Sequence, residues 1–312
     1  MLIQYYIATS GNNETRVAQL LEERSGWVRA HGRTSNVQLV WGNPLVQLQL
    51  GRGGSSRPRQ MVSRLPNSLS LTDKGRLYDN IAAYCEKREI PLTFLPITFH
   101  LDRSTPAHSL SGSIGEFVEL FEYIADNTSL TNMWMIKPTK MNQGRDIHLF
   151  SSLERLRQLV MGMGTSTHSL KDGLLDFVRK ENSVVLQKYI ESPLLIGGHK
   201  FDIRVWALVD HEGVLYYYPE GYLRFSSLPY TLGSSHQDQL VHLTNHSLQK
   251  HGSKYQESFN IQPLAVLEEH TNSRTYQRFI TRIKEIITIT FRATIGSHPP
   301  KLAKNVPQQR NF

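Results

Sequence analysis

Charged side chains occupy alternate positions of a segment that otherwise has the composition of a buried strand. Residues 200–210 read KFDIRVWALVD, with Lys200, Asp202 and Arg204 at every second position. Successive side chains of a strand point to opposite faces, so these three share one face and the apolar residues between them share the other. The charged face either lies in water or forms the floor of a polar cleft for a charged ligand.

A second predicted strand repeats this pattern a short distance along the chain. In the segment EGYLRFSS, the residues Glu220, Tyr222 and Arg224 fall on one face. Two adjacent strands that each carry an arginine on the same side would give a cleft a cationic floor, which suits phosphate or carboxylate groups.

Two further segments have residues that suit a nucleotide. Lys137 ends the apolar run WMIK, and a turn containing Gly144 follows it. A lysine at a strand end provides a point charge for phosphate, and a glycine turn lets backbone N–H groups approach the phosphates closely. The chain has no Walker A motif. In VVLQKYIESPLL, Gln187 and Lys188 end a strand, which either presents backbone groups to adenine or is a plain connector with a solvated lysine.

A pair of histidines has a spacing found in metal sites. His242 and His246 are four residues apart in VHLTNHSLQK, but Leu243 stands where an H-E-x-x-H motif has its glutamate. We therefore expect structural or substrate-side histidines and no zinc site. Thr244 and Asn245 provide short polar side chains at a predicted turn into a helix.

The residue patterns around these segments predict strands and helices that alternate irregularly, and hence a mixed α/β (α+β) fold with several small lobes. Strands are expected at 2–8, 37–42, 94–101, 133–139, 183–190, 200–210 and 214–227, and helices at 14–28, 73–88, 115–127 and 271–292. The tract GRGGSSRPRQ at 51–60 predicts a mobile loop.

The composition is that of a folded, basic protein. The 312 residues carry a formal charge of +8, with a pI near 9.5, so an acidic partner is expected. The single cysteine, Cys85, excludes an internal disulfide and indicates a reducing compartment. The N-terminus lacks the pattern of a signal peptide, and no apolar run approaches the roughly 20 residues of a membrane span. Membrane attachment therefore has no support.

Five segments, in this order, resemble the tubulin–tyrosine-ligase-like family, whose catalytic core is of the ATP-grasp type. They are KPTKMNQGRDIHLF, VLQKYIESPLL, HKFDIRVWALV, EGYLRFSS and VHLTNHSLQK. YYIATSGNN, VQLVWG and LPNSLSLTDKGRLYDNI also look like the leading domain of that family, so the resemblance covers nearly the whole chain. It implies an N-terminal α/β domain at 1–70, a central ATP-grasp lobe at 71–190 and an incomplete C-terminal ATP-grasp lobe at 191–312. The nucleotide cleft would lie between the last two.

The resemblance also implies roles for individual residues. The residues implied to bind ATP are Lys74, Lys137, Gly144, Arg145, Gln187, Lys188, Tyr189, Ile190, Lys200, Asp202, Thr244 and Asn245. Lys137 matches the first nucleotide lysine of the family, and 187–190 match its adenine hinge. Lys74 lies in a segment that varies in the family. The implied catalytic residues are Lys200, Asp202, Arg204 and Arg224, which would hold phosphate and the acceptor or amino-acid substrate.

The reaction implied by the resemblance is an ATP-dependent ligation. ATP phosphorylates a carboxylate, and the amine of a free amino acid attacks the acyl phosphate, while Lys, Arg and Mg²⁺ neutralise the phosphates. The expected acceptors are the acidic C-terminal tails of tubulin in microtubules, which a charge of +8 suits. We expect glutamate to be added, with glycine and tyrosine as alternatives. The implied location is the cytoplasm and cytoskeleton, including the cilium or basal body.

Two features of the sequence depart from the family pattern. Asp146 replaces the second glycine of the usual G-R-G-I, which removes backbone freedom and either places a negative charge near the phosphates, weakening ATP binding, or leaves the side chain pointing away. The carboxylates and the asparagine that hold magnesium in the family are expected beyond Phe312, so no metal ligand is assigned. We therefore expect an inactive fragment of an active enzyme, with a non-catalytic tubulin- or microtubule-binding pseudoenzyme as the alternative. Nucleic acid is not an expected partner, because no recognisable nucleic-acid module is present.

Overall fold

The computed structural model describes residues 2–7, 14–31, 37–42, 61–63, 65, 67–127, 132–161, 169–210, 212–232 and 239–295. The chain divides into two compact units, residues 1–68 and 69–312. The predicted boundary between a central and a C-terminal lobe near residue 190 stays a prediction. The glycine- and arginine-rich tract at 51–60 and the C-terminal segment VPQQRNF lie outside the described residues.

The first unit is built on a four-stranded parallel sheet in the order β2-β1-β3-β4. Its elements are β1 (Ile3–Ile7), α1 (Glu14–Glu22), β2 (Trp27–Arg29), β3 (Leu39–Trp41) and β4 (Met61–Val62). Tyr5 and Ile7 of β1 pack against Ala18 and Leu21 of α1. The predicted helix at 14–28 was too long, because Gly26 adopts a φ of 81° and the chain then enters β2.

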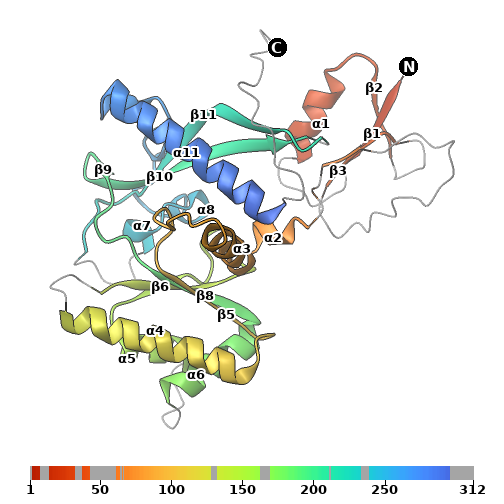
Figure 1. Ribbon diagram of the computed structural model, residues 1–312. Coiled ribbons are helices and arrows are strands. Elements are labelled where there is room, and N and C mark those ends of the chain that lie inside the picture. The colour runs from red at the N-terminus through yellow and green to blue at the C-terminus, as the bar shows by residue number, and fades with distance from the viewer. Residues whose placement is uncertain are drawn as a thin grey trace. The chain divides into compact units, whose positions relative to one another are not determined.

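One sheet of the second unit is antiparallel, in the order β5-β8-β6-β7. Its strands are β5 (Thr98–Asp102), β6 (Trp134–Pro138), β7 (His148–Phe150) and β8 (Ser183–Lys188). Helices α4 (Ala107–Asn127), α5 (Leu153–Met161) and α6 (Leu170–Glu181) lie along one face, as Figure 1 shows. Trp134 is fully buried there, with its ring centroid 5.2 Å from that of Phe117. Because strand residues alternate, Lys137 and Gln187 fall on the opposite face.

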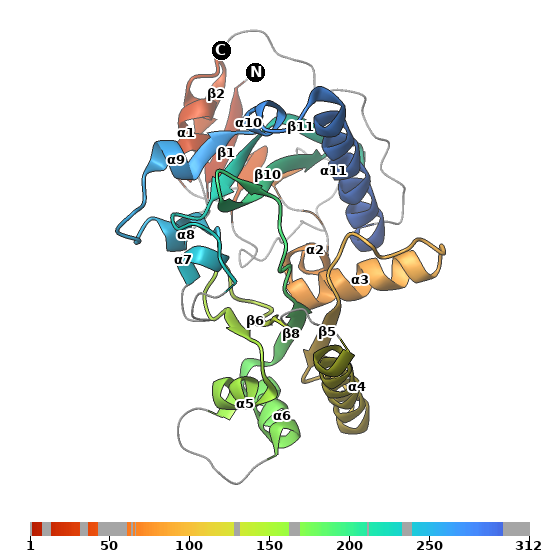
Figure 2. The ribbon, with the colours of Figure 1, turned by 90° about the vertical axis from the view of Figure 1, so that its left-hand side faces the viewer.

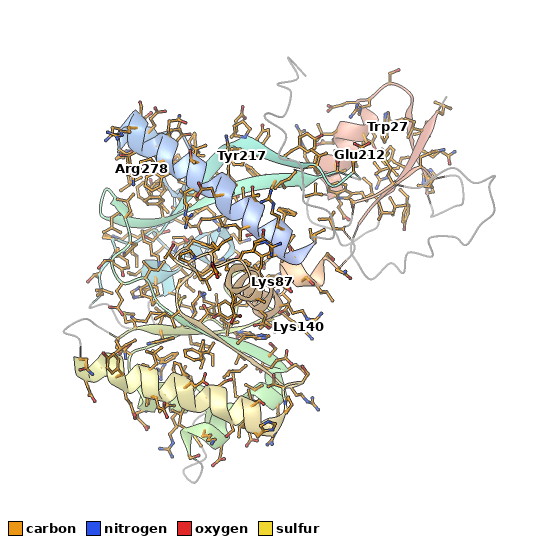
Figure 3. All side chains as sticks on the ribbon, in the orientation of Figure 1. Trp27, Lys87, Lys140, Glu212, Tyr217 and Arg278 are labelled. Carbon is orange, nitrogen blue, oxygen red and sulfur yellow. The ribbon has the colours of Figure 1, made fainter. Side chains whose placement is uncertain are left out.

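The other sheet of the second unit has the order β12-β11-β10-β9 and is also antiparallel. Its strands are β9 (Leu195–Ile196), β10 (His199–Val209), β11 (Leu215–Phe225) and β12 (Ile261–Pro263), followed by helix α11 (Ser273–Thr294). Phe201 and Ile203 pack with Tyr276 and Ile280 of α11 in one apolar cluster. Tyr217 of β11 lies beside this helix (Figure 3), with Lys284 Nζ 5.4 Å from its ring centroid.

The apolar residues of KFDIRV therefore face α11, and the charged residues between them lie on the opposite face of the sheet. Asp202 is paired across the strands with Arg224, and Arg204 with Tyr222. The register shifts between Arg204 and Trp206. Gly221 is required at this bulge, since a Cβ there would lie 2.6 Å from the carbonyl oxygen of Arg204.

Helix α3 (Lys74–Glu86) connects the two sheets of the second unit. It contacts β5 and β8 on one side and α11 on the other, as both ribbon views show (Figures 1 and 2). Asp73 caps its N-terminus by accepting hydrogen bonds from the amides of Gly75 and Arg76, both at 3.1 Å. The first residue of the helix, Lys74, is thereby held at the edge of the polar face.

The remaining short elements are α2 (Leu69–Thr72), α7 (Gln239–His242), α8 (His246–Gln249), α9 (Glu257–Asn260) and α10 (Val266–Glu269). The prediction of a mixed α/β fold is confirmed. Among the described helices, none has both the length and the apolar composition to cross a bilayer.

Candidate active site: a polar site with three lysines

Three lysines from different elements lie close enough to perturb one another, and we call the region around them the three-lysine site. Lys74 begins α3, Lys137 belongs to β6 and Lys200 belongs to β10. Burial, reinforced by the charge of Lys74, lowers the pKa of Lys137 to about 8. Burial, reinforced by the charge of Lys137, lowers the pKa of Lys200 to about 8, against the opposing effect of Asp202. A group of partly buried ammonium ions is suited to an anionic ligand, which would restore their pKa values.

Neutral polar groups hold Lys137 in place. Its Nζ donates to Gln187 Oε1 at 2.7 Å, and Gln187 Nε2 donates to Thr98 Oγ1 at 2.9 Å. The Thr98 hydroxyl in turn donates to the carbonyl of Pro96 at 2.8 Å. This chain fixes the direction of the lysine without neutralising its charge. Thr98 was not predicted as a site residue, although the alternate polar residues of β5 were a signal for a polar face.

Lys74 is held by backbone carbonyl groups. Its Nζ donates to the carbonyls of Pro138 at 3.1 Å and Thr139 at 3.2 Å, and also to that of Met141. Three acceptors match the three N–H groups of an ammonium ion. Burial lowers the pKa of Lys74. In this conformation, Lys74 joins α3 to the segment after β6, and a phosphate would have to replace one of these carbonyls.

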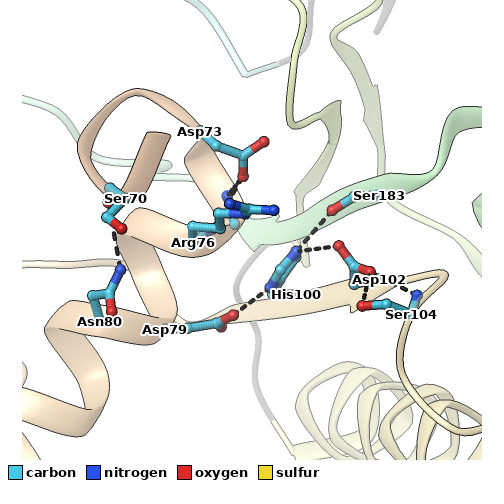
Figure 4. A network of polar contacts seen from close by, with 10 residues as sticks. Ser70, Asp73, Arg76, Asp79, Asn80, His100, Asp102, Ser104 and Ser183 are labelled. Carbon is cyan, nitrogen blue, oxygen red and sulfur yellow. Dashed lines mark hydrogen bonds and ion pairs between the residues drawn. The ribbon is translucent and has the colours of Figure 1, made fainter. Parts of the chain in front are cut away.

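A polar network beneath α3 holds the start of that helix on the sheet (Figure 4). His100 Nδ1 lies 2.7 Å from Asp79 Oδ2 of α3, and His100 Nε2 lies 2.7 Å from Ser183 Oγ of β8. Burial opposes protonation of His100, but its hydrogen bond to Asp79 and the nearby carboxylates outweigh burial and raise its pKa. Gly75 sits against this ring, since a Cβ there would lie 2.1 Å from His100 Nε2. The network therefore fixes the position of Lys74.

The glycine turn lies against the short helices α7 and α8. Gly144 has a φ of 79°, and a Cβ there would lie 3.0 Å from Asn245 Oδ1. Ser247 Oγ donates to the carbonyl of Gln143 at 2.9 Å, and Gln239 Nε2 donates to that of Ile147 at 3.2 Å. The structure thus brings together Gly144 and Asn245, which the resemblance implies as ATP-binding residues.

Two charged residues of the turn point outward. Arg145 is exposed and its Nη2 donates to Asn142 Oδ1 at 2.7 Å. Asp146 is also exposed and has a φ of 55°, in the left-handed region that favours glycine but tolerates aspartate. Burial lowers the pKa of His148, and the Asp146 carboxylate partly opposes this effect. The negative charge of Asp146 is therefore felt by His148 at the edge of the turn.

The predicted hinge is only partly directed toward the three-lysine site. The Lys188 side chain lies on the opposite face of β8 from Gln187, and its Nζ donates to the carbonyl of Met133 at 3.1 Å and to the Glu191 carboxylate. The amides of Lys188 and Tyr189 donate to the carbonyls of Ile97 at 2.8 Å and Met133 at 2.9 Å. The structure thus does not bring the Lys188 ammonium to the other lysines.

Tyr189 and the segment of α7 hold Lys200. Lys200 Nζ donates to Tyr189 Oη at 2.8 Å and to the carbonyl of His242 at 2.9 Å. It also lies 4.2 Å from the centroid of the Tyr189 ring. Burial is the main cause of the raised pKa of Tyr189, so its hydroxyl stays protonated at physiological pH.

The charged face of β10 and β11 carries an ion pair. Arg224 Nε and Nη2 donate to the two carboxylate oxygens of Asp202 at 2.7 and 2.8 Å. Thr244 Oγ1 donates to Asp202 Oδ2 at 2.7 Å. Burial disfavours the charged form of Arg224, but the bond to Asp202 outweighs it and raises the pKa. Arg204 lies on the same face and is exposed.

The two histidines that are four residues apart lie in separate helices. His242 ends α7 and is 1% exposed, with Nδ1 3.0 Å from Tyr189 Oη, whereas His246 begins α8. The described part of the chain contains no group of three or more His, Cys, Asp or Glu side chains placed to hold a metal ion. Asp202, the acidic residue assigned to this site, is occupied by Arg224 and Thr244. No Mg²⁺ ligand is therefore assigned among the described residues.

The fold and the site together define a class of protein. Two antiparallel sheets carry lysines with lowered pKa values, an Asp–Arg pair and a glycine turn, which is a suitable set for nucleotide phosphates. The sequence model of the Tubulin-tyrosine ligase family matches residues 54–311. The chain belongs to this family, and its mixed α/β architecture is of the ATP-grasp-like kind that the family has.

Individual relatives are similar over shorter regions. The chain is 33% identical over 216 residues to a probable alpha-tubulin polyglutamylase, Ttll1, of Tetrahymena thermophila, covering 64% of this chain and 47% of the relative. It is 40% identical over 122 residues to the human tubulin monoglycylase TTLL3, covering 38% and 14%. It is 27% identical over 246 residues to the mouse tubulin polyglutamylase TTLL5, covering 78% and 16%. The chain thus matches less than half the length of each of these relatives.

Proposed function

We propose that this chain binds ATP at the three-lysine site and acts in an ATP-dependent ligase that adds an amino acid to carboxylates of tubulin tails. Membership of the family supports a ligase. The observation that carries ATP binding is the pair Lys137 and Lys200, whose pKa values are both lowered to about 8 while their described hydrogen-bond partners are neutral. Such ammonium ions gain most from a phosphate ligand.

The parts of ATP are assigned to residues as follows. Lys137 and Lys200 bind phosphate, and Lys74 joins them if it leaves one of its carbonyl acceptors. The glycine turn offers backbone N–H groups to the phosphates. The amides of Lys188 and Tyr189 already donate within the protein, so we assign the adenine-binding amide to Ile190, a residue that is 56% exposed.

The two arginines are assigned to the acceptor and to the developing charge. In the first step a carboxylate oxygen attacks the γ-phosphorus and ADP leaves. In the second step the amino nitrogen attacks the acyl carbon, phosphate leaves, and the nitrogen loses a proton to give the amide. Arg224, kept in place by Asp202, and the exposed Arg204 are assigned to the acceptor carboxylate and the acyl phosphate. No step is assigned to Mg²⁺, because no ligand for it is assigned among the described residues.

Substitution of the two lysines tests the ATP site. We expect Lys137→Met and Lys200→Met each to weaken ATP binding at least tenfold in titration calorimetry, since each removes a charge-assisted contact worth roughly 1.5–3 kcal/mol. Lys180→Met is the matched control, because it removes the same charge from an exposed position at the end of α6. Equal affinity for all three variants and the unchanged protein would contradict the assignment.

We further propose that the amino acid added is glutamate, that the acceptor is tubulin and that the protein acts at the cytoskeleton. Two of the relatives are named polyglutamylases and one a monoglycylase, so glutamate is preferred, and glycine is the main alternative. Incubation of the protein with microtubules, ATP and each labelled amino acid in turn would decide among them. Transfer of glutamate alone supports the proposal, and no transfer of any amino acid contradicts ligase activity of this chain and fits either an inactive fragment or a non-catalytic tubulin-binding protein. Immunofluorescence would show whether the protein lies on cytoplasmic microtubules, the cilium or the basal body.

A further inference from the structure

Beyond the residues that the family pattern assigns to ATP, the geometry points to His242 as a positioning residue that fixes the ammonium group of Lys200 through the hydroxyl of Tyr189. The inference rests on the proposed nucleotide site. It assigns a role to a side chain that is 1% exposed and therefore cannot touch a substrate.

The hydrogen bond between Lys200 and Tyr189 has a fixed direction. A lysine ammonium can only donate, so the Tyr189 oxygen accepts from Lys200 Nζ at 2.8 Å. On the other side of the same hydroxyl, His242 Nδ1 lies 3.0 Å away. The Tyr189 hydroxyl is thus held between a ring nitrogen and the ammonium group, and the Tyr230 hydroxyl is a further partner.

The main chain of His242 acts on the same ammonium group. Its carbonyl oxygen accepts from Lys200 Nζ at 2.9 Å, so the residue contacts Lys200 directly as well as through Tyr189. Only the side chain can be removed by substitution, and the carbonyl stays in every variant. A variant of His242 therefore removes the path through Tyr189 together with the packing of the imidazole ring, and leaves the carbonyl contact in place.

Aromatic packing makes this arrangement rigid. The His242 ring meets the Tyr189 ring edge-on, with centroids 5.5 Å apart and an interplanar angle of 86°. It meets the Tyr230 ring in the same manner at 5.9 Å and 89°. Tyr230 is itself fixed, because its hydroxyl donates to the carbonyl of Glu191 at 2.7 Å. The imidazole thus packs between the Tyr189 and Tyr230 rings, both of which lie near Lys200.

The charges around Lys200 explain why such positioning is needed. Burial lowers the pKa of Lys200 most, and the charge of Lys137 on β6 lowers it further. The Asp202 carboxylate on β10 raises this pKa. Asp202 is also committed to Arg224 and Thr244. The Tyr189 hydroxyl and the His242 carbonyl therefore direct the ammonium group of Lys200 in the absence of ligand.

Three variants test the inference in the unliganded protein, so its outcome does not depend on ligase activity. The readout is the pKa of Lys200, followed by NMR of the labelled lysine side chain, with resonance assignment from Lys200→Arg. We expect Tyr189→Phe and His242→Ala to lower this pKa below its value of about 8. His242→Asn should restore it, because the asparagine amide has polar atoms where Nδ1 stood. The affinity for ATP at pH 7 should fall about tenfold in the first two variants and recover in the third.

The possible outcomes separate this inference from the proposed function. A folded His242→Ala variant with an unchanged Lys200 pKa would overturn the inference, even if its melting temperature fell. If His242→Ala fails to fold, an unchanged pKa in Tyr189→Phe, which keeps the ring, overturns it equally. If the unchanged protein binds no ATP while the pKa moves as expected, the proposed function fails and the positioning role of His242 stands.

Discussion

Replacement of Lys137 by methionine should stabilise the unliganded protein and weaken its binding of ATP. The pKa of Lys137 is lowered from 10.5 to about 8, so holding the charged form in the fold costs on the order of 3 kcal/mol at neutral pH. Methionine removes this cost and keeps a chain of similar length. It also removes the charge-assisted hydrogen bond to Gln187, which contributes about 1.5–3 kcal/mol. The expected net gain in the free energy of unfolding is about 1 kcal/mol at pH 7.

The gain should depend on pH in a defined direction. Because the lysine loses its proton in the folded protein near pH 8 but in the unfolded chain only near 10.5, the unchanged protein becomes more stable relative to the variant between these values. The advantage of Lys137→Met should therefore be full below pH 8 and shrink toward pH 10. Urea unfolding at pH 7 and pH 10 without nucleotide measures it, with Lys180→Met as the exposed control. A variant less stable than the unchanged protein at pH 7 would refute the reasoning.

Three further predictions concern α3 and the glycine turn. Gly75→Ala should destabilise the protein by about 1–3 kcal/mol in thermal unfolding, because the new Cβ would lie 2.1 Å from the fixed His100 ring. Gly112→Ala in α4 is the control: its Cβ would meet nothing within 4 Å, so this change should be neutral or stabilising. The pKa of His100 is higher in the folded protein than in the unfolded chain, so protonated His100 should stabilise the fold below its unfolded pKa. This stabilisation should be lost as the pH rises through the pKa of the folded protein. Asp79→Asn should flatten the pH dependence, as measured by melting curves at a series of pH values. Asp146→Asn should tighten ATP binding several-fold in calorimetry by removing a negative charge while keeping a residue that tolerates a φ of 55°, and weaker binding would contradict this.

The sequence predicts best where side-chain alternation decides the outcome. The face shared by Lys200 and Asp202 in KFDIRV is the face that carries the Asp202–Arg224 pair, while Phe201 and Ile203 pack toward α11. The helical spacing at 271–292 predicted α11, which spans Ser273–Thr294. These features follow from local periodicity, and so a single sequence is enough to find them.

Contacts with distant main-chain groups were beyond prediction. Lys74 donates to the carbonyls of Pro138 and Thr139, and nothing in the residues around position 74 indicates those acceptors. Lys188 is a different case, because strand alternation already places it on the opposite face from Gln187. Its place among the implied ATP-binding residues came from the resemblance, and the alternation by itself assigns only its backbone to the hinge.

The central claim is that ATP binds to buried lysines that are close to losing their protons. It is tested most directly by the affinity and proton uptake of ATP binding, measured by calorimetry from pH 7 to pH 9 in two buffers of different ionisation enthalpy. With pKa values of about 8 for Lys137 and Lys200, the affinity should fall roughly a hundredfold over this range, tenfold for each lysine, with protons taken up on binding above pH 8. Tight binding that does not change with pH and takes up no protons, or no binding at pH 7, would contradict it.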